Sequence, residues 1–552
     1  MIESAKHDAA EDALLTVSGL DIQFAGSDDT AAVTGLGYRV ARGESLGIVG
    51  ESGSGKTVSC LSLIGLLPPG GCVTAGSAIF DGVDLLSLSE SEQRRVRCRR
   101  IAMVFQDPMT ALNPYLTIGD QVTEPMRYHL RLSREAARNR AIELLVETGI
   151  HDAANRLGQY PHEFSGGMRQ RAMIAMALAA EPDLLIADEP TSALDVTVQD
   201  QILSLLRRLL ADRGVGLLFI SHDLALVRRM ATRVLVMEKG RAVEQGDTIG
   251  VFKQPGHPYT RALIDALPRG PKEERSDGSN LPSKDTRTSL LRLEKLSVTY
   301  ALAGKPLRAV DDVSLSIRRG EVLGLVGESG SGKTSLSRAI ARIGHPSRGE
   351  IRINDVPLHD LQGSALRAQR RSVQMVFQDP YSSLDPRMTI HDSIAEPVRL
   401  HHLASGREAV TQRVLELLEA VELDTSWAHR FPHEFSGGQR QRVAIARALA
   451  AEPELLIADE PVSALDVTIQ ARILNLLLRL VEQRGFAMLF ITHDLAVVRK
   501  VADRTAVMQA GCIVECEDTE TIFTAPQTSY TKQLLQASGS DGFTMRSDDG
   551  QR

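Results

Sequence analysis

The stretch "GESGSGKT" occurs at Gly50–Thr57 and again, unchanged, at Gly327–Thr334. Each copy follows a short apolar run typical of a buried strand, "SLGIVG" or "VLGLVG", and each opens a helical pattern. A strand, a glycine-rich loop and a helix in this order predict a phosphate-binding loop, because the glycines let backbone N–H groups close around phosphate oxygens. The helix start also favours negative charge. The chain is therefore predicted to hold two nucleotide sites.

The last two residues of each loop carry most of its chemistry. Lys56 and Lys333 are predicted to reach the β and γ phosphates of ATP, and the hydroxyls of Thr57 and Thr334 to hold Mg²⁺. The complete set of predicted loop residues is Gly50, Glu51, Ser52, Gly53, Ser54, Gly55, Lys56 and Thr57, with Gly327, Glu328, Ser329, Gly330, Ser331, Gly332, Lys333 and Thr334.

Composition indicates an ordinary globular protein of more than one domain. The chain has 552 residues, of which 24% are charged and 43% hydrophobic, and a single core does not usually grow to this length. The net charge of -7 gives no global electrostatic reason to bind nucleic acid. The five cysteines form no pair or cluster at zinc spacing, which favours free thiols in a reducing compartment.

No segment of the sequence has the features of a signal peptide or a membrane span. The first residues, "MIESAKHDAAEDA", are polar and acidic. Apolar tracts such as "MIAMALAAEPDLLIA" are interrupted by charged residues and proline well short of the length that a span requires. We therefore expect any membrane role to depend on a partner protein.

A long internal repeat organises the chain. "PHEFSGG", "LLIADEP" and "SALDVT" each recur after 271 residues, which indicates a duplicated domain. Strand-like runs alternate with helical patterns, and the stretches near 88–180 and 360–451 are mostly helical, so we expect α/β domains with a mixed sheet and a helical insert. The predicted boundaries are a polar tail at 1–12, domain 1 at 13–268, a flexible linker at 269–289, domain 2 at 290–536 and a disordered tail at 537–552.

Paired acids end an apolar run in both halves. "LLIADEP" places Asp188 and Glu189 after a predicted strand, and Asp459 and Glu460 hold the same positions in the second half. The first acid of each pair is placed to help hold Mg²⁺ and the second to polarise an attacking water. A solvated turn is the alternative for such a pair on its own, but the pair follows a phosphate loop twice.

Two further polar residues follow strand-like runs in each half. His222 and His493 stand in "ISHD" and "ITHD", where an imidazole could contact a γ phosphate or the water, although a single histidine there is usually structural. Gln106 and Gln378, in "VFQDP", are neutral and could approach Mg²⁺ or water.

Two features of each half leave two interpretations open. "SGG" precedes a helical pattern in each half and predicts either a second anion site or a simple helix cap. The residues concerned are Ser165, Gly166 and Gly167, with Ser436, Gly437, Gly438 and Gln439. Phe24 and Tyr300 end early strand-like runs and could stack on adenine, although core packing explains them equally well.

Together these motifs resemble the nucleotide-binding domain of ABC transporters, twice over and across nearly the whole chain. "FSGGM" and "FSGGQ" resemble the family signature, and "SALD" its D-loop. The resemblance implies two ATPs sandwiched between the halves. One site would join Lys56, Thr57, Gln106, Asp188, Glu189 and His222 to Ser436, Gly437, Gly438 and Gln439, and the other Lys333, Thr334, Gln378, Asp459, Glu460 and His493 to Ser165, Gly166, Gly167 and Met168. Met168 stands where the family pattern has Gln.

Finer motifs, including "YPHEFSGGMRQR" and "GHPYTRALIDALP", resemble the importer group for peptides, nickel and glutathione. That resemblance implies a peripheral ATPase on the cytoplasmic face of the inner membrane. Its partners would be two permeases, docked near the segments after Gln106 and Gln378, and indirectly an extracytoplasmic solute-binding protein. The alternative is a soluble twin ATPase acting on ribosomes or DNA. This alternative is disfavoured by the short linker, the absence of zinc cysteines and the negative net charge. The sequence names no transported solute.

Overall fold

The structure, a computed structural model, describes residues 13–25, 31–192, 194–268, 270–272, 289–302, 305–358, 361–463 and 465–538. The chain forms two compact units, one built mainly of residues up to 266 and the other mainly of residues from 267 onward. The predicted tail at 1–12 lies outside the described residues, as do most of the predicted linker (269 and 273–288) and residues 539–552 of the second tail.

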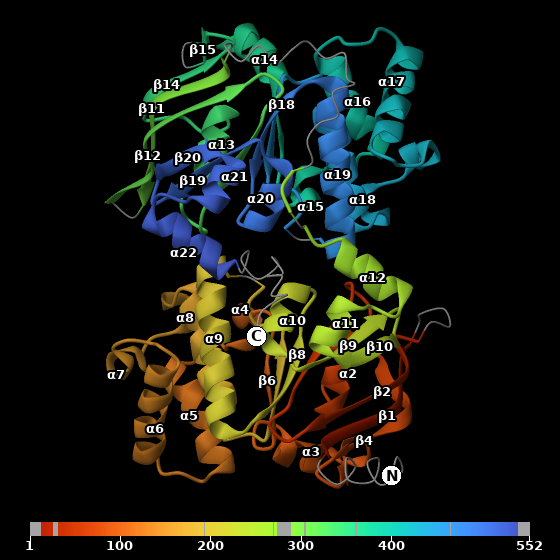
Figure 1. The fold of residues 1–552 in the computed structure, drawn as a ribbon, viewed down its shortest axis with the longest axis vertical. Helices are drawn as coiled ribbons and strands as arrows, with labels where there is room; N and C mark the ends of the chain where they lie inside the picture. The colour runs from red at the N-terminus through yellow and green to blue at the C-terminus, as the bar shows by residue number, and fades with distance from the viewer. Residues whose placement is uncertain are drawn as a thin grey trace, which may run out of the picture. The chain divides into compact units, whose positions relative to one another are not determined.

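Unit 1 contains two sheets (Figure 1). An antiparallel sheet has the order β2-β1-β4-β5, and a mixed six-stranded sheet the order β10-β9-β3-β8-β7-β6, in which only β9 and β10 are antiparallel. The strands are β1 (Ala13–Phe24), β2 (Val33–Ala41), β3 (Ser45–Val49), β4 (Gly71–Phe80), β5 (Val83–Asp84), β6 (Ile101–Val104), β7 (Leu184–Asp188), β8 (Gly216–Ile220), β9 (Arg233–Glu238) and β10 (Arg241–Asp247). Both sheets share one apolar core with the helix after the phosphate loop.

The predicted helical insert lies between β6 and β7 and has a core of its own. The helices of unit 1 are α2 (Lys56–Leu63), α3 (Glu90–Val96), α4 (Pro108–Ala111), α5 (Ile118–His129), α6 (Arg134–Glu147), α7 (Ala153–Arg156), α8 (Gly166–Leu178), α9 (Val196–Arg213), α10 (Leu224–Met230), α11 (Thr248–Lys253) and α12 (Pro258–Asp265). The core of the insert includes the buried alanines 137 and 141 of α6, 172 and 175 of α8, and 179, which directly follows α8.

Unit 2 repeats the architecture, with sheet orders β12-β11-β14-β15 and β16-β17-β18-β13-β19-β20. Its strands are β11 (Ser289–Leu302), β12 (Lys305–Arg318), β13 (Val322–Val326), β14 (Arg348–Ile353), β15 (Val356–Pro357), β16 (Val373–Val376), β17 (Leu455–Asp459), β18 (Ala487–Ile491), β19 (Arg504–Gln509) and β20 (Cys512–Asp518). Its helices are α13 (Lys333–Ile340), α14 (Gly363–Ser372), α15 (Pro380–Ser383), α16 (Ile390–Leu400), α17 (Arg407–Ala420), α18 (Gly437–Leu449), α19 (Val467–Arg484), α20 (Leu495–Val501), α21 (Thr519–Thr524) and α22 (Ser529–Ala537).

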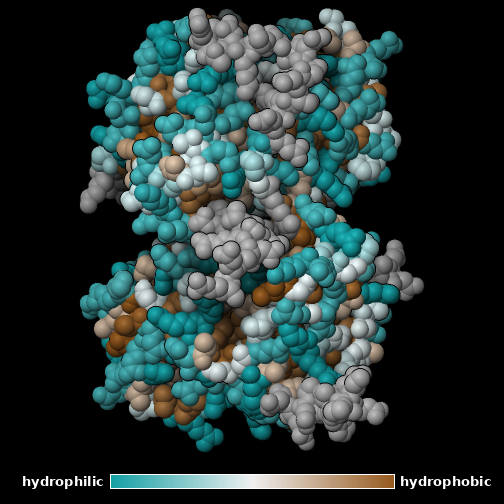
Figure 2. Space-filling view, in the orientation of Figure 1, coloured by the Kyte–Doolittle hydropathy of each residue, from teal (hydrophilic) through white to brown (hydrophobic). Residues whose placement is uncertain are grey.

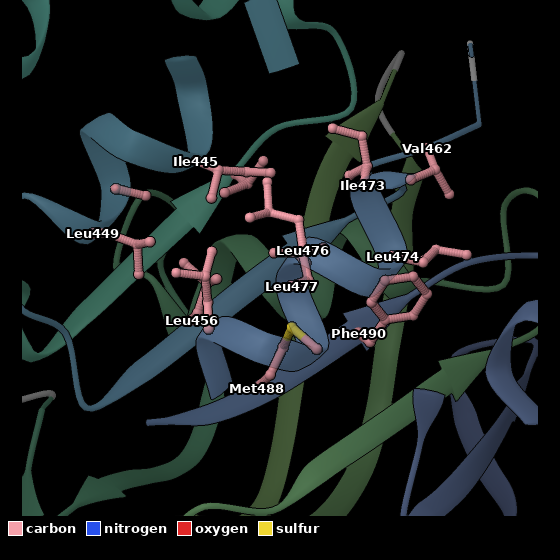
Figure 3. Close-up of a cluster of buried hydrophobic side chains, with 14 of the residues drawn as sticks. Ile445, Leu449, Leu456, Val462, Ile473, Leu474, Leu476, Leu477, Met488 and Phe490 are labelled. Carbon is pink, nitrogen blue, oxygen red and sulfur yellow. The ribbon is translucent and has the colours of Figure 1, made fainter. Parts of the chain in front are cut away.

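The central strands are buried along their whole length, as parallel strands covered on both faces must be. In unit 2, α18 and α19 cover β17 and β18 through an apolar cluster (Figure 3). Its labelled members are Ile445, Leu449, Leu456, Val462, Ile473, Leu474, Leu476, Leu477, Met488 and Phe490. This cluster fixes the end of β17, where the paired acids begin.

No helix among the described residues has the length and apolar character that a bilayer crossing needs. The face drawn in Figure 2 is mainly hydrophilic, with small separate apolar areas.

Candidate active sites

Both predicted phosphate loops connect a parallel strand to a helix, β3 to α2 and β13 to α13. Gly50 has φ 156°, and a Cβ there would lie 2.2 Å from the carbonyl oxygen of Met237. Gly55 has φ 93°, and its Cβ would lie 2.7 Å from the carbonyl oxygen of Ala32. The equivalent glycines of unit 2 are equally crowded. Glycine is therefore required at these two positions of each loop by close backbone approach.

The loop lysines are buried and held by backbone carbonyls. Lys56 Nζ donates to the carbonyl oxygens of Gly50 at 2.7 Å and Glu51 at 2.8 Å. Lys333 Nζ makes the equivalent two bonds at 2.7 Å each. Burial lowers the pKa of Lys333, although the nearby Glu460 carboxylate acts in the opposite direction. Each ammonium group is thus fixed inside its loop, and its role as a phosphate ligand stays a prediction.

The first acid of each pair is the last residue of a central strand and is buried. Asp188 accepts a hydrogen bond from the Thr57 hydroxyl at 3.1 Å, which brings two predicted Mg²⁺ ligands together. In unit 2, Asp459 accepts instead from Ser337 Oγ at 3.1 Å. Burial is the main cause that raises the pKa of Asp188 to about 6, and the charge of Glu189 adds to it. Burial likewise raises the pKa of Asp459.

The second acid of each pair has an unusual backbone conformation. Glu189 has φ 45° and Glu460 has φ 47°, a left-handed geometry that is uncommon for residues with side chains and concentrates at functional sites. The Glu189 N–H donates to the Ile220 carbonyl oxygen at 2.9 Å, and Glu460 makes the same bond to Ile491. The same turn occurs in both units and sets the direction in which the glutamate leaves the strand end.

The predicted glutamine and histidine of each unit meet this glutamate. Gln106 Nε2 donates to Glu189 Oε2 at 3.0 Å, and His222 Nδ1 lies 2.7 Å from Glu189 Oε1. The corresponding distances are 2.9 Å for Gln378 to Glu460 and 3.4 Å for His493 to Glu460. Three residues that are far apart in sequence therefore form one cluster in each unit.

The electrostatics of the cluster favour an ionised glutamate. Burial alone would raise the pKa of Glu189, but the hydrogen bond and charge of His222, together with Lys56, leave that pKa below its usual value. The same bond to Glu189 raises the pKa of His222 against the opposing effect of burial. The pKa values of Glu460 and His493 shift in the same directions. At neutral pH each glutamate can accept a proton or orient a water molecule.

The Ser-Gly-Gly segments are helix N-termini. Ser165 caps α8 by accepting from the Met168 N–H at 3.4 Å, and Ser436 caps α18 by accepting from the Gln439 N–H at 3.4 Å. Gln439 Oε1 also accepts from the Ser436 N–H at 2.9 Å, which completes a capping box. Both interpretations of these segments remain open, because a capped helix start can also present amides to an anion.

The two candidate adenine-stacking residues lie on equivalent strands. Phe24 ends β1 and packs against the core of unit 1, with its ring over Gly71. Tyr300 lies on β11 and is 38% exposed. Adenine stacking by either residue stays a prediction.

One contact at each loop was missed by the sequence reasoning. The N–H of Glu51 donates to the Tyr259 hydroxyl at 3.1 Å, and that of Glu328 to the Tyr530 hydroxyl at 3.2 Å. The available signal was the pair Tyr-Thr, which recurs after 271 residues near the end of each half.

Comparison with known proteins gives two family matches. A family described as "ABC transporter" matches residues 33–192 and 310–463. The family "Oligopeptide/dipeptide transporter, C-terminal region" matches residues 243–290.

Curated relatives match nearly the whole chain. The glutathione import ATP-binding protein GsiA of Escherichia coli O157:H7 is 46% identical over 556 residues, which cover 95% of this chain and 89% of the relative. The protein of the same name from Pectobacterium atrosepticum is 44% identical over 539 residues, covering 92% and 86%. Among solved structures, a dimeric ATP-binding cassette bound to ADP and Pi is 33% identical, with a TM-score of 0.39, and covers 42% of this chain and 98% of its own.

Proposed function

The chain belongs to the ATP-binding proteins of ABC transporters, with two ABC ATPase domains, and from this membership we propose how its residues bind and hydrolyse ATP. It is the ATP-binding subunit of an importer of the oligopeptide/dipeptide family and couples ATP hydrolysis to transport. The observation that carries the residue assignment is the cluster of glutamine, glutamate and histidine at the end of a central strand, which occurs in both units.

In the proposed mechanism the loop amides bind the ATP phosphates, and each loop lysine exchanges its backbone carbonyl partners for β and γ phosphate oxygens. Glu189 and Glu460 polarise the attacking water, because their carboxylates stay ionised at neutral pH. His222 and His493 hold these carboxylates by hydrogen bonding and can contact the γ phosphate.

The residues proposed to hold Mg²⁺ are Thr57, Gln106 and Asp188, with Thr334, Gln378 and Asp459 in the second half. Hydroxyl, amide and carboxylate oxygens are the hard ligands that suit this ion, and the contact between Thr57 and Asp188 brings two of them together. When bound, Mg²⁺ would neutralise charge on the β and γ phosphates.

We propose that the transported solute is a peptide or a similar small molecule, since relatives of this chain are named for glutathione import. The chain would act at the cytoplasmic face of the inner membrane with two permease subunits, and indirectly with an extracytoplasmic solute-binding protein. The segments after Gln106 and Gln378 are proposed to dock the permeases, and they carry large exposed apolar side chains, among them Met109, Tyr115 and Tyr381.

We also infer from the family resemblance that the Ser-Gly-Gly segment of each half completes the ATP site of the other, so that both halves are needed for full activity. The domain boundaries 13–268 and 290–536 are part of this proposal. Lys56→Ala and Lys333→Ala, each alone, should then abolish most activity rather than half of it.

Trapping the complex tests the importer function directly. The variant Glu189→Gln with Glu460→Gln is incubated with ATP in native membranes, purified and analysed by mass spectrometry. Two multi-spanning permeases are expected to co-purify, and they should be held more firmly than in a control carrying Lys56→Ala with Lys333→Ala, which keeps the docking segments but cannot bind ATP productively. Ribosomal or DNA-repair proteins in their place would overturn the proposal.

A further inference from the structure

The segment after β10 returns to the first phosphate loop, and its counterpart after β20 returns to the second. Helix α12 is labelled in Figure 1. Tyr259 lies in its first turn, and the Tyr259 hydroxyl accepts the Glu51 N–H at 3.1 Å. Tyr530 lies in the first turn of α22, and its hydroxyl accepts the Glu328 N–H at 3.2 Å. Both contacts are made within a single unit.

A glutamate fixes the start of each of these helices. Glu244 in β10 accepts from the backbone N–H groups of Gly256 at 2.7 Å and His257 at 3.1 Å. Glu515 in β20 accepts from the two equivalent N–H groups at 2.8 and 3.2 Å, and from the Thr531 hydroxyl at 2.6 Å. The helix start, and the tyrosine in it, is therefore tied to the edge of the six-stranded sheet.

The tyrosine and the loop lysine hold the two ends of one peptide unit. The carbonyl oxygen of Gly50 accepts from Lys56 at 2.7 Å, and the N–H of the same peptide bond, which belongs to Glu51, donates to Tyr259. Because a peptide unit is planar and rigid, the tyrosine fixes the direction in which this carbonyl faces the lysine. The peptide unit that joins residues 327 and 328 has the same two contacts.

We propose that Tyr259 and Tyr530 are positioning residues for ATP binding. Each orients the first peptide of its phosphate loop and thereby the lysine that receives the β and γ phosphates. The inference rests on the proposed function of these loops. In the first half, Tyr259 lies within the oligopeptide/dipeptide C-terminal match, 243–290, so that segment contributes to the ATP site.

The test is the double variant Tyr259→Phe with Tyr530→Phe in the full chain, which keeps both rings and removes both hydroxyls. Since each loop loses one hydrogen bond, we expect KM and Kd for ATP to rise about three- to tenfold, with kcat within about twofold of wild type. Kd is measured by equilibrium dialysis, which does not require hydrolysis.

Tyr38→Phe is the matched control. The Tyr38 hydroxyl is buried and has no hydrogen-bond partner among the described residues, and the second half has Leu315 at this position. This variant should bind ATP as wild type does.

The outcomes separate the two proposals. Unchanged KM and Kd in the double variant, with a lower unfolding temperature, would show that the tyrosines only anchor the helices and would overturn the inference. Wild-type protein that binds ATP but does not hydrolyse it would overturn the proposed catalytic roles, while the Kd comparison would still decide the role of the tyrosines.

Discussion

The two halves of the chain share their reactive residues but differ in the residues that support them. Lysine, glutamine, the second acid of each pair and histidine recur with similar contacts in each unit. Some of their neighbours recur, such as Tyr259 and Tyr530, but others do not. Cys60 stands where the second half has Ser337, and Met168 where it has Gln439. Any functional asymmetry between the halves should therefore arise from the supporting contacts.

The exchange between Cys60 and Ser337 changes the hydrogen bonding of the buried aspartate. Ser337 donates a hydrogen bond to Asp459, whereas Cys60 offers a buried thiol near Asp188. Burial, and secondarily the charge of Asp188, raises the pKa of the Cys60 thiol well above its usual value, so the thiol stays neutral and is only a weak donor. Asp188 depends on Thr57 instead.

The proposed docking segments differ as well. Tyr115 is 88% exposed in the first half, and Arg387, which pairs with Asp385, holds the equivalent position in the second. An exposed aromatic side chain and an ion pair present different chemistry to a partner. The two segments are thus not interchangeable surfaces.

The largest effect should come from removing the catalytic carboxylates. Glu189→Gln and Glu460→Gln together should reduce kcat by about 100-fold or more, because general-base catalysis typically contributes that much. The single variants compare the two halves directly. The histidine Nδ1 lies 2.7 Å from the glutamate in the first half and 3.4 Å in the second, and equal losses of kcat would mean that this difference has no kinetic consequence. Steady-state phosphate release measures both.

Replacing the buried aspartate should stabilise the free protein. The folded-state pKa of Asp188, about 6, lies above its ordinary value of 3.8, so its ionisation costs stability at pH 7, and this cost is lost progressively as pH falls from about 6 to that ordinary value. Asp188→Asn should add on the order of 1–3 kcal/mol at pH 7 and little at pH 4, while ATPase activity is lost. Urea unfolding at both pH values measures this, with Asp459→Asn as the matched variant. A stability gain that does not depend on pH would contradict the explanation.

The histidines should titrate at different pH values. Both pKa values are raised by the neighbouring glutamate, and the shorter distance at His222 leads us to expect the larger shift there. The stabilisation from each pair is complete below the pKa of the unfolded histidine and is lost as pH rises through the raised folded pKa. In Glu189→Gln the pKa of His222 should fall, because the charge of Glu189 is lost while burial and Lys56 still lower this pKa and only Asp223 still raises it. NMR titration of labelled histidine checks this, with His493 in the same sample as the internal reference.

The smallest effect should come from the helix caps. Met168→Gln should let residue 168 accept from the Ser165 N–H, as Gln439 does from Ser436, and stabilise the first unit by about 0.5–1 kcal/mol. Gln439→Met should cost the second unit a similar amount. Denaturant unfolding measures both, and equal midpoints for wild type and both variants would show that the capping box adds nothing here.

Much of the fold and of the site could be predicted from local patterns. Three local patterns were enough to predict two α/β ATPase domains with helical inserts. These were the order of strand, loop and helix, the repeat after 271 residues, and the apolar runs that end in acids. The contacts of Gln106 and His222 with Glu189 could not be derived in this way, because they join the ends of separate strands. Their recurrence indicated a site but gave no geometry.

The sequence by itself determined which residues have the chemistry for ATP. Lysine, hydroxyl and carboxylate groups stand at fixed spacing beside a glycine-rich loop, and the backbone preferences that form this loop are local. Only the tertiary structure decided what surrounds them. The pKa of Asp188 depends on burial by elements distant in the chain, and the peptide at Gly50 is held by a tyrosine more than two hundred residues away. Desolvation and long-range hydrogen bonds are properties of the packed fold, and local sequence patterns do not encode them.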